Sequence, residues 1–149
     1  MTKIRITKEF HFEMAHALWG YDGLCKNIHG HSYKLLVTLI GEPSLDKQSA
    51  KLGMVLDYSD LKSIVKTTII DQLDHALAVN GNSPHKDIDK TNLMFSKVVF
   101  LDYQPTCENM LIDFSERLIN KLPVGVELHS LILRETGSSY AEWFASDNK

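Results

Sequence analysis

The sequence lacks a long hydrophobic run and a block of basic residues. No apolar stretch approaches the roughly 18 residues that a membrane-spanning helix needs, so we expect no membrane partner. The 16 lysines and arginines are outnumbered by 19 acidic residues, for a formal net charge of -3. Such a balance disfavours nucleic acid as a partner. The ligand is therefore expected to be a small molecule.

Cysteine is also scarce. Cys25 and Cys107 are too few for a disulfide framework or for a zinc site built on paired Cys-x-x-Cys motifs. The opening MTKIRI alternates charged and apolar side chains, which predicts a strand rather than a signal peptide. We therefore expect a cytoplasmic protein. Without repeats, linkers or low-complexity tracts, residues 1–149 predict one domain, long enough to bury a core unaided.

Two long strands are predicted near the N-terminus. In residues 3–16, Phe10, Phe12 and Met14 fall on one face, and His16 continues this face at the strand end. Residues 29–40 alternate in the same way, and residues 17–28 between the strands predict a loop. Two consecutive strands joined by a loop most simply form an antiparallel hairpin.

The rest of the chain mixes helical and extended patterns. Helical spacing predicts one helix capped by Asp57 or Ser59 and ending near residues 74–77, and a second opening at Thr106. Extended patterns predict a short strand or strand end at 53–57, strands at 97–102 and 126–135, and a last one at 139–144. Residues 80–96 carry no clear element. This order predicts an α+β domain with an antiparallel β-sheet.

The strongest chemical signal is the pair His29 and His31 at the start of the second strand. Side chains two residues apart on a strand point the same way, about 6.5–7 Å apart, so both rings can reach one cation. The hairpin brings His16 beside them if its register is right. Three histidines with an open fourth position are typical of catalytic zinc. The alternative is a half-exposed polar strand start.

Cys25 lies in the loop expected to overhang these histidines. A thiol near a cation is favoured as thiolate, which makes it a usable base or nucleophile. It can equally be a small buried hydrophobic residue or a fourth zinc ligand, and the residues alone leave all three open.

Two further positions are candidates. Asp74-His75 at a helix end can form a carboxylate-oriented base, although such pairs commonly solvate a helix end. Glu135 ends an apolar strand, where its carboxylate can accept two hydrogen bonds from an amidine-like ring edge or pair with a surface cation. The other histidines, His11, His85 and His129, have no convergent partners in the sequence.

Six ordered segments resemble the 6-pyruvoyltetrahydropterin synthase family. They are FHFEMAH (10–16), CKNIHGHSY (25–33), GMVLDYSDLK (53–62), LDHALAVN (73–80), PTCEN (105–109) and RET (134–136). The resemblance implies the tunnelling fold, an antiparallel sheet with two helices packed on one face. It also implies homotrimeric barrels that stack into hexamers, with active sites between subunits.

The resemblance also implies roles for individual residues. The metal set resembling the family's Zn2+ ligands is His16, His29 and His31. Cys25 resembles the catalytic cysteine, and Asp74 with His75 resembles the pair that works with it in proton transfer. Glu135 resembles the glutamate that anchors the pterin ring, and Thr106 and Glu108 resemble pterin-pocket residues. Cys107 stands where the family more usually has alanine or serine.

The implied substrate is 7,8-dihydroneopterin triphosphate. The bacterial branch cleaves its side chain, releasing acetaldehyde and triphosphate and leaving 6-carboxy-5,6,7,8-tetrahydropterin, a step towards queuosine. The animal branch keeps a pyruvoyl side chain. Three residues separate Cys25 from His29, as in the bacterial branch, which favours a zinc-dependent lyase that cleaves the side chain. Alternatives are the pyruvoyl-forming reaction and a non-catalytic pterin-binding module with structural zinc.

Overall fold

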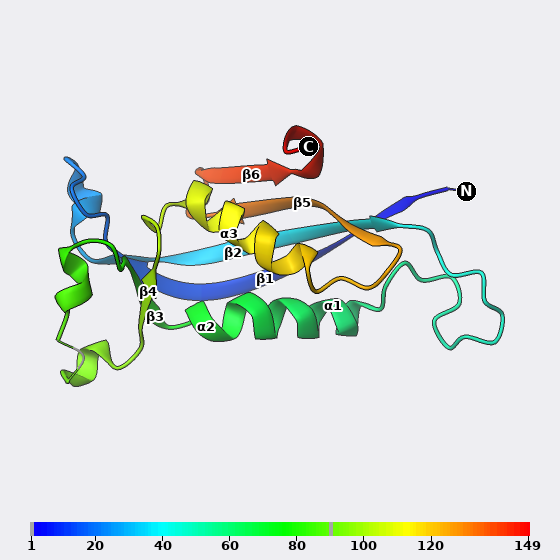
Figure 1. Ribbon diagram of the computed structural model, residues 1–149, viewed down its shortest axis with the longest axis horizontal. Helices are drawn as coiled ribbons and strands as arrows, with labels where there is room; N and C mark the ends of the chain where they lie inside the picture. Colours follow the sequence, from blue (N-terminus) through cyan, green and yellow to red (C-terminus); the bar gives the residue numbers. More distant parts are fainter. Residues whose placement is uncertain (1, 90) are drawn as a thin grey trace.

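The β1–β2 hairpin is the longest feature of the computed structural model, which describes residues 2–89 and 91–149 (Figure 1). β1 (Ile4–His16) pairs antiparallel with β2 (His29–Gly41) along their whole lengths, from Ile4 opposite Gly41 to His16 opposite His29. The alternation of apolar residues explains this register, because a slip by one residue would turn every buried side chain to solvent. The expected hairpin is confirmed.

The hairpin lies within a six-stranded mixed sheet of order β4-β3-β1-β2-β5-β6. On one side, β2, β5 and β6 pair antiparallel, as expected. On the other side, β3 pairs parallel with the last three residues of β1, and β4 pairs parallel with β3. The outer strands are β3 (Ala76–Asn80), β4 (Val98–Leu101), β5 (Val126–Arg134) and β6 (Tyr140–Phe144).

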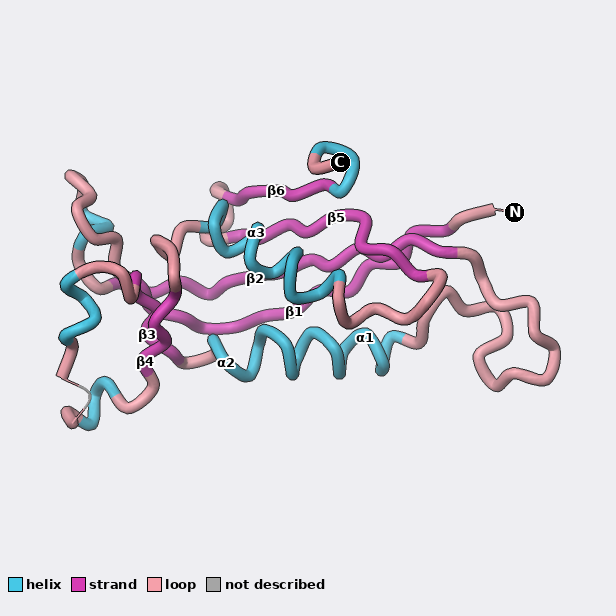
Figure 2. Tube along the Cα trace, in the orientation of Figure 1, coloured by secondary structure: helices cyan, strands magenta, loops and turns pink. Residues whose placement is uncertain are grey.

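Both long helical segments cover the same face of the sheet, as Figure 2 shows. The first consists of α1 (Tyr58–Val65), a π-helical turn (Lys66–Ile70) and α2 (Asp71–Leu73), and the second is α3 (Cys107–Ile119). Their apolar sides meet Phe12 and Tyr33, whose rings stack with centroids 5.0 Å apart. The α+β prediction with helices on one face is confirmed, and the opposite sheet face carries mainly polar side chains.

The expected strand at 53–57 is wrong. Gly53 has φ +82°, a left-handed conformation that glycine adopts without the strain of a side chain. Four residues later, the Asp57 side chain accepts the Ser59 N–H and caps α1. The segment is therefore a turn followed by a helix cap.

The first helix also ends earlier than expected, and β3 follows it. Residues 76–79 are all buried and all apolar. Such a continuous apolar run shows neither strand nor helix periodicity, so the sequence does not distinguish a strand from the end of a helix. The connection at 80–96 contains two 3-10 turns, Pro84–Asp87 and Leu93–Phe95. Two more occur at Leu24–Lys26 and Ala145–Asp147. Within the described ranges, no helix is long and apolar enough to cross a membrane.

Candidate metal centre and substrate pocket

Three histidines converge where the β1–β2 hairpin meets the loop 17–28. The pairing of His16 with His29 places these rings on one face, and His31 follows two residues along β2. One ligand nitrogen from each ring lies within 4.8 Å of the others. Among the described residues this is the group that can hold a metal ion, and Cys25 is not a member.

The backbone fixes which nitrogen of two rings faces the centre. His16 Nδ1 lies 2.7 Å from the carbonyl oxygen of Pro105, and His29 Nδ1 lies 2.8 Å from that of Asn27. A carbonyl oxygen only accepts, so both Nδ1 atoms donate and carry the ring proton. In a neutral ring, Nε2 then keeps a bare lone pair. Burial lowers the pKa of His16, which favours that neutral form.

Two such lone pairs face each other across 3.0 Å, between the Nε2 atoms of His16 and His29. Facing lone pairs repel unless an electron acceptor lies between them. Two nitrogens about 2.0–2.1 Å from a tetrahedral metal lie about 3.3 Å apart, close to the observed separation. The donor set therefore fits a divalent cation.

The third ring supports the same reading. His31 Nε2 is buried and has no hydrogen-bond partner among the described residues. Burial lowers the pKa of His31, and the Glu135 carboxylate partly opposes this effect. That carboxylate lies 3.5 Å from His31 Nε2 and 3.6 Å from His16 Nε2. An unsatisfied buried polar atom costs free energy unless a ligand engages it.

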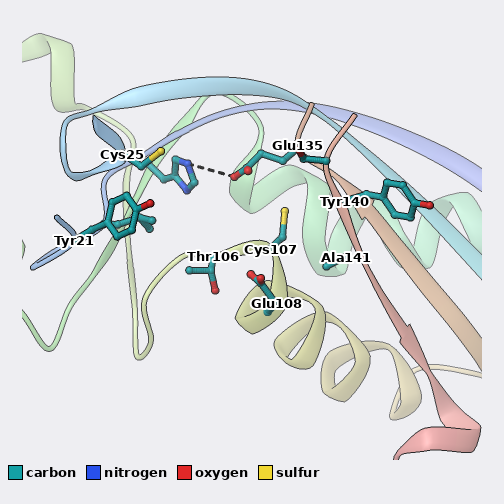
Figure 3. A pocket seen from close by; sticks show the side chains of 11 residues that line it. Tyr21, Cys25, Thr106, Cys107, Glu108, Glu135, Tyr140 and Ala141 are labelled. Carbon is teal, nitrogen blue, oxygen red and sulfur yellow. Dashed lines mark ion pairs between the residues drawn. The ribbon is translucent and has the colours of Figure 1, made fainter. Parts of the chain in front are cut away.

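A pocket of about 310 Å³ opens beside the cluster, between the loop 17–28, the start of α3 and the β5–β6 turn. Figure 3 shows the Cys25 thiol, the Glu135 carboxylate and Cys107 around this space, with a dashed line for the Glu135–His16 contact. Thr106 and Glu108 line it as well. Five candidate site residues therefore share one pocket: His16, Cys25, Thr106, Glu108 and Glu135. Its size suits a small organic ligand.

Several groups at this site carry no sequence signal of their own. The carbonyls of Pro105 and Asn27 belong to the backbone, which every residue has. Tyr33 is fully buried, its ring packs edge-on against His16, and burial followed by Glu135 raises its pKa. Tyr21 and Tyr140 line the pocket, and the strand pattern alone does not show that their rings reach it.

Asp74 and His75 do not reach this pocket. His75 borders a second hollow of about 330 Å³ together with Glu13, His31 and Ser32, at the β1–β2 hairpin. Asp74 accepts the Glu13 N–H at 2.9 Å, the largest effect lowering its pKa, and contacts His75 Nδ1 at 3.0 Å. His75 has φ +60°, which is unusual for a side-chain-bearing residue and is held by a hydrogen bond from its N–H to Glu13 O.

Solved structures share this fold. A likeness to an uncharacterized protein from Wolinella succinogenes has a TM-score of 0.79 at 22% identity, covering 97% of this chain and 99% of that one. The 6-pyruvoyl tetrahydropterin synthase of Caenorhabditis elegans matches with a TM-score of 0.69 at 24% identity, covering 97% of both chains. The fold and the site together define a tunnelling-fold protein with a cluster of three histidines that can hold a metal ion.

The sequence narrows this class to a family. The family model described as 6-pyruvoyl tetrahydropterin synthase matches residues 5–145. The 6-carboxy-5,6,7,8-tetrahydropterin synthase of Haemophilus influenzae is 40% identical over 141 residues, covering 93% of this chain and 97% of the relative. The chain belongs to the 6-pyruvoyl tetrahydropterin synthase family, and the expected family and fold are confirmed.

Proposed function

We propose that this protein is a zinc-dependent lyase that converts 7,8-dihydroneopterin triphosphate and one water molecule to 6-carboxy-5,6,7,8-tetrahydropterin, acetaldehyde and triphosphate. One observation carries the proposal: two histidine Nε2 lone pairs face each other at the mouth of a pocket that also holds a thiol and a carboxylate. The Haemophilus relative bears the name of this product. Three histidine nitrogens are a ligand set typical of zinc.

The pocket residues divide into binding and proton-handling groups. The Glu135 carboxylate can accept two hydrogen bonds from the amino group and ring N–H of a pterin. Thr106 caps α3 by accepting the Asn109 N–H, which leaves its hydroxyl proton for a ligand at the pocket floor. Glu108, in the first turn of α3, adds a second acceptor at the rim.

His16, His29 and His31 would hold the zinc ion, which supplies Lewis-acid polarisation of the substrate side-chain hydroxyls when bound. Cys25 faces the same space, where its thiolate would take a proton from a side-chain carbon and the resulting thiol would return it as triphosphate leaves. Asp74 orients His75 through Nδ1, leaving Nε2 for proton transfer.

The position of the Asp74–His75 pair supports a shared site. Neither residue lines the pocket beside Cys25 and Glu135 in its own chain, and we propose that the pair serves the pocket of a neighbouring copy. The outer edge of β1 is unpaired with any described strand from Ile4 to Glu13, and β6 ends the sheet on the other side. Pairing of such edges between copies closes a barrel. We propose trimeric barrels that stack as hexamers.

The reaction suits the cytoplasm, where we place it. Cys25 and Cys107 are both free thiols, and a reducing compartment keeps them so.

The test is incubation of the zinc-loaded protein with 7,8-dihydroneopterin triphosphate and assay of acetaldehyde. We expect acetaldehyde in equal amount to the carboxylated product. A pyruvoyl product without acetaldehyde would favour the other reaction of the family. If the protein binds the pterin but turns none of it over, it is a non-catalytic pterin-binding module.

Cys25→Ala distinguishes catalysis from metal binding. We expect zinc content to stay near that of the parent protein while kcat falls by about 10² or more, because the proton-handling group is lost. Cys107→Ala is the matched control, since this buried thiol carries no proposed step. Loss of zinc in Cys25→Ala would instead mean that the thiol is a ligand.

A further inference from the structure

The loop that carries Cys25 has little structure of its own. Residues 17–28 contain a single 3-10 turn, Leu24–Lys26, and Leu24 is 86% exposed. The loop is closed by a hydrogen bond of 3.0 Å from the Leu18 N–H to the Cys25 carbonyl. The place of the thiol therefore depends on two anchors: the start of β2 at His29, and whatever holds the chain at Leu18 and Trp19.

The side chain of Gln104 holds that point from a distant part of the sequence. Its Oε1 accepts the Trp19 N–H at 3.2 Å, and its Nε2 donates to the Trp19 carbonyl at 2.8 Å. The backbone fixes the orientation of the amide, because Trp19 N–H can only donate and its carbonyl can only accept. One side chain thus binds both polar groups of one loop residue.

Gln104 is itself well anchored. Its carbonyl accepts the Thr106 N–H at 2.8 Å and the Asn109 side-chain amide at 3.0 Å, which ties it to the N-terminus of α3. The next residue, Pro105, is buried and holds His16 through its carbonyl. Gln104 and Pro105 therefore connect the thiol loop and a metal-cluster histidine to the same rigid helix end.

We propose that Gln104 is a positioning residue, whose amide sets Cys25 at its working distance from the histidine cluster. The proposal rests on the proposed function, in which Cys25 handles a proton. Gln104 does not line the pocket of its own chain, so it acts through Trp19 and Leu18 rather than on the substrate. Displacements of about 1 Å at a reacting group can cost about 10² in rate.

The first test is Gln104→Met, which keeps the length of the side chain and removes both hydrogen bonds. We expect iodoacetamide to alkylate Cys25 about threefold faster or more, because the loosened loop exposes the thiol. In turnover, we expect kcat to fall about tenfold, with KM and zinc per chain within about twofold of the parent. Gln48→Met, at an exposed position of the loop 42–57, is the control and should change neither quantity.

Gln104→Glu is the second variant, in case Gln104→Met does not fold. A carboxylate still accepts the Trp19 N–H but repels the Trp19 carbonyl instead of donating to it, so the same two changes are expected. Unchanged Cys25 alkylation and kcat in a folded variant would overturn the proposal. A variant that loses zinc and melts at a lower temperature, with the alkylation rate of Cys25 unchanged, would also overturn the proposal. Gln104 would then stabilise the fold without positioning Cys25.

The two readouts separate this proposal from the proposed function. Alkylation of Cys25 is measured without substrate and decides whether Gln104 places the thiol. If the parent protein releases no acetaldehyde, the proposed reaction fails, while the alkylation rates still test the role of Gln104.

Discussion

At the residue scale, the site divides into groups that the sequence reveals and groups that it hides. His16, His29 and His31 could be found because strand alternation places residues two apart on one face and a hairpin joins its strand ends. The orientation of their rings could not be found, since it depends on the Asn27 and Pro105 carbonyls. Backbone acceptors have no residue type, and only the folded chain shows where they point.

One prediction concerns the metal cluster. His29→Ala should lower bound zinc from about one per chain to well below half, because two imidazoles bind a cation much more weakly than three. The fold should persist, since the ring lies at the start of β2 and outside the apolar core. Elemental analysis and circular dichroism measure the two effects.

His11→Ala is the matched control for that prediction. His11 lies on the neighbouring strand β1, and its exposed ring pairs with the Glu9 carboxylate at 2.9 Å. Zinc content equal to the parent is expected, and a similar loss in both variants would contradict the assignment of His29.

The two thiols should differ in reactivity. Burial, followed by the nearby Glu135 carboxylate, raises the pKa of Cys107 to about 12. At pH 8, roughly one Cys107 in ten thousand is then a thiolate, the form that attacks iodoacetamide. Mass spectrometry should find Cys25 alkylated and Cys107 unmodified until the pH nears 11 or the chain unfolds. Rapid labelling of Cys107 in the folded protein at pH 8 would contradict this.

At the element scale, the strands with one buried face were predictable and those buried on both faces were not. β1 and β2 alternate because the helices cover one side of the sheet. Residues 76–79 of β3 are all buried, so their apolar run shows no alternation and resembles the end of the preceding helix. The segment 53–57 looked extended because its apolar residues hide the turn at Gly53 and the cap at Asp57.

The turn before β5 allows a clean test of backbone strain. Gly125 has φ +87° and open space where a Cβ would lie, so Gly125→Ala meets no clash and costs only the left-handed conformation. We expect a loss of about 1 kcal/mol, or a melting temperature lower by about 2–4 °C. Gly137→Ala is the control, because Gly137 has open space and no positive φ. Equal melting temperatures for both variants would contradict the explanation.

At the scale of the whole molecule, metal and fold are expected to be coupled. The repulsion between the facing lone pairs of His16 and His29 is relieved only when a cation lies between them. Removing zinc with a chelator should therefore abolish turnover and lower the melting temperature, and added zinc should restore both, since a ligand of the native state stabilises it. Calorimetry with and without chelator measures the shift, and identical melting curves would contradict the coupling.

The separation of Asp74-His75 from their own pocket has a consequence for genetics. If each site combines Cys25 of one copy with His75 of the next, Cys25→Ala and His75→Ala damage different halves of it. Each variant alone should be inactive, yet co-expressed in equal amounts they should form mixed rings in which roughly one site in four has both intact halves. Two null alleles of this gene would then complement each other within one cell. Activity no higher than that of either variant alone, in rings shown to be mixed, would place the whole site within one chain.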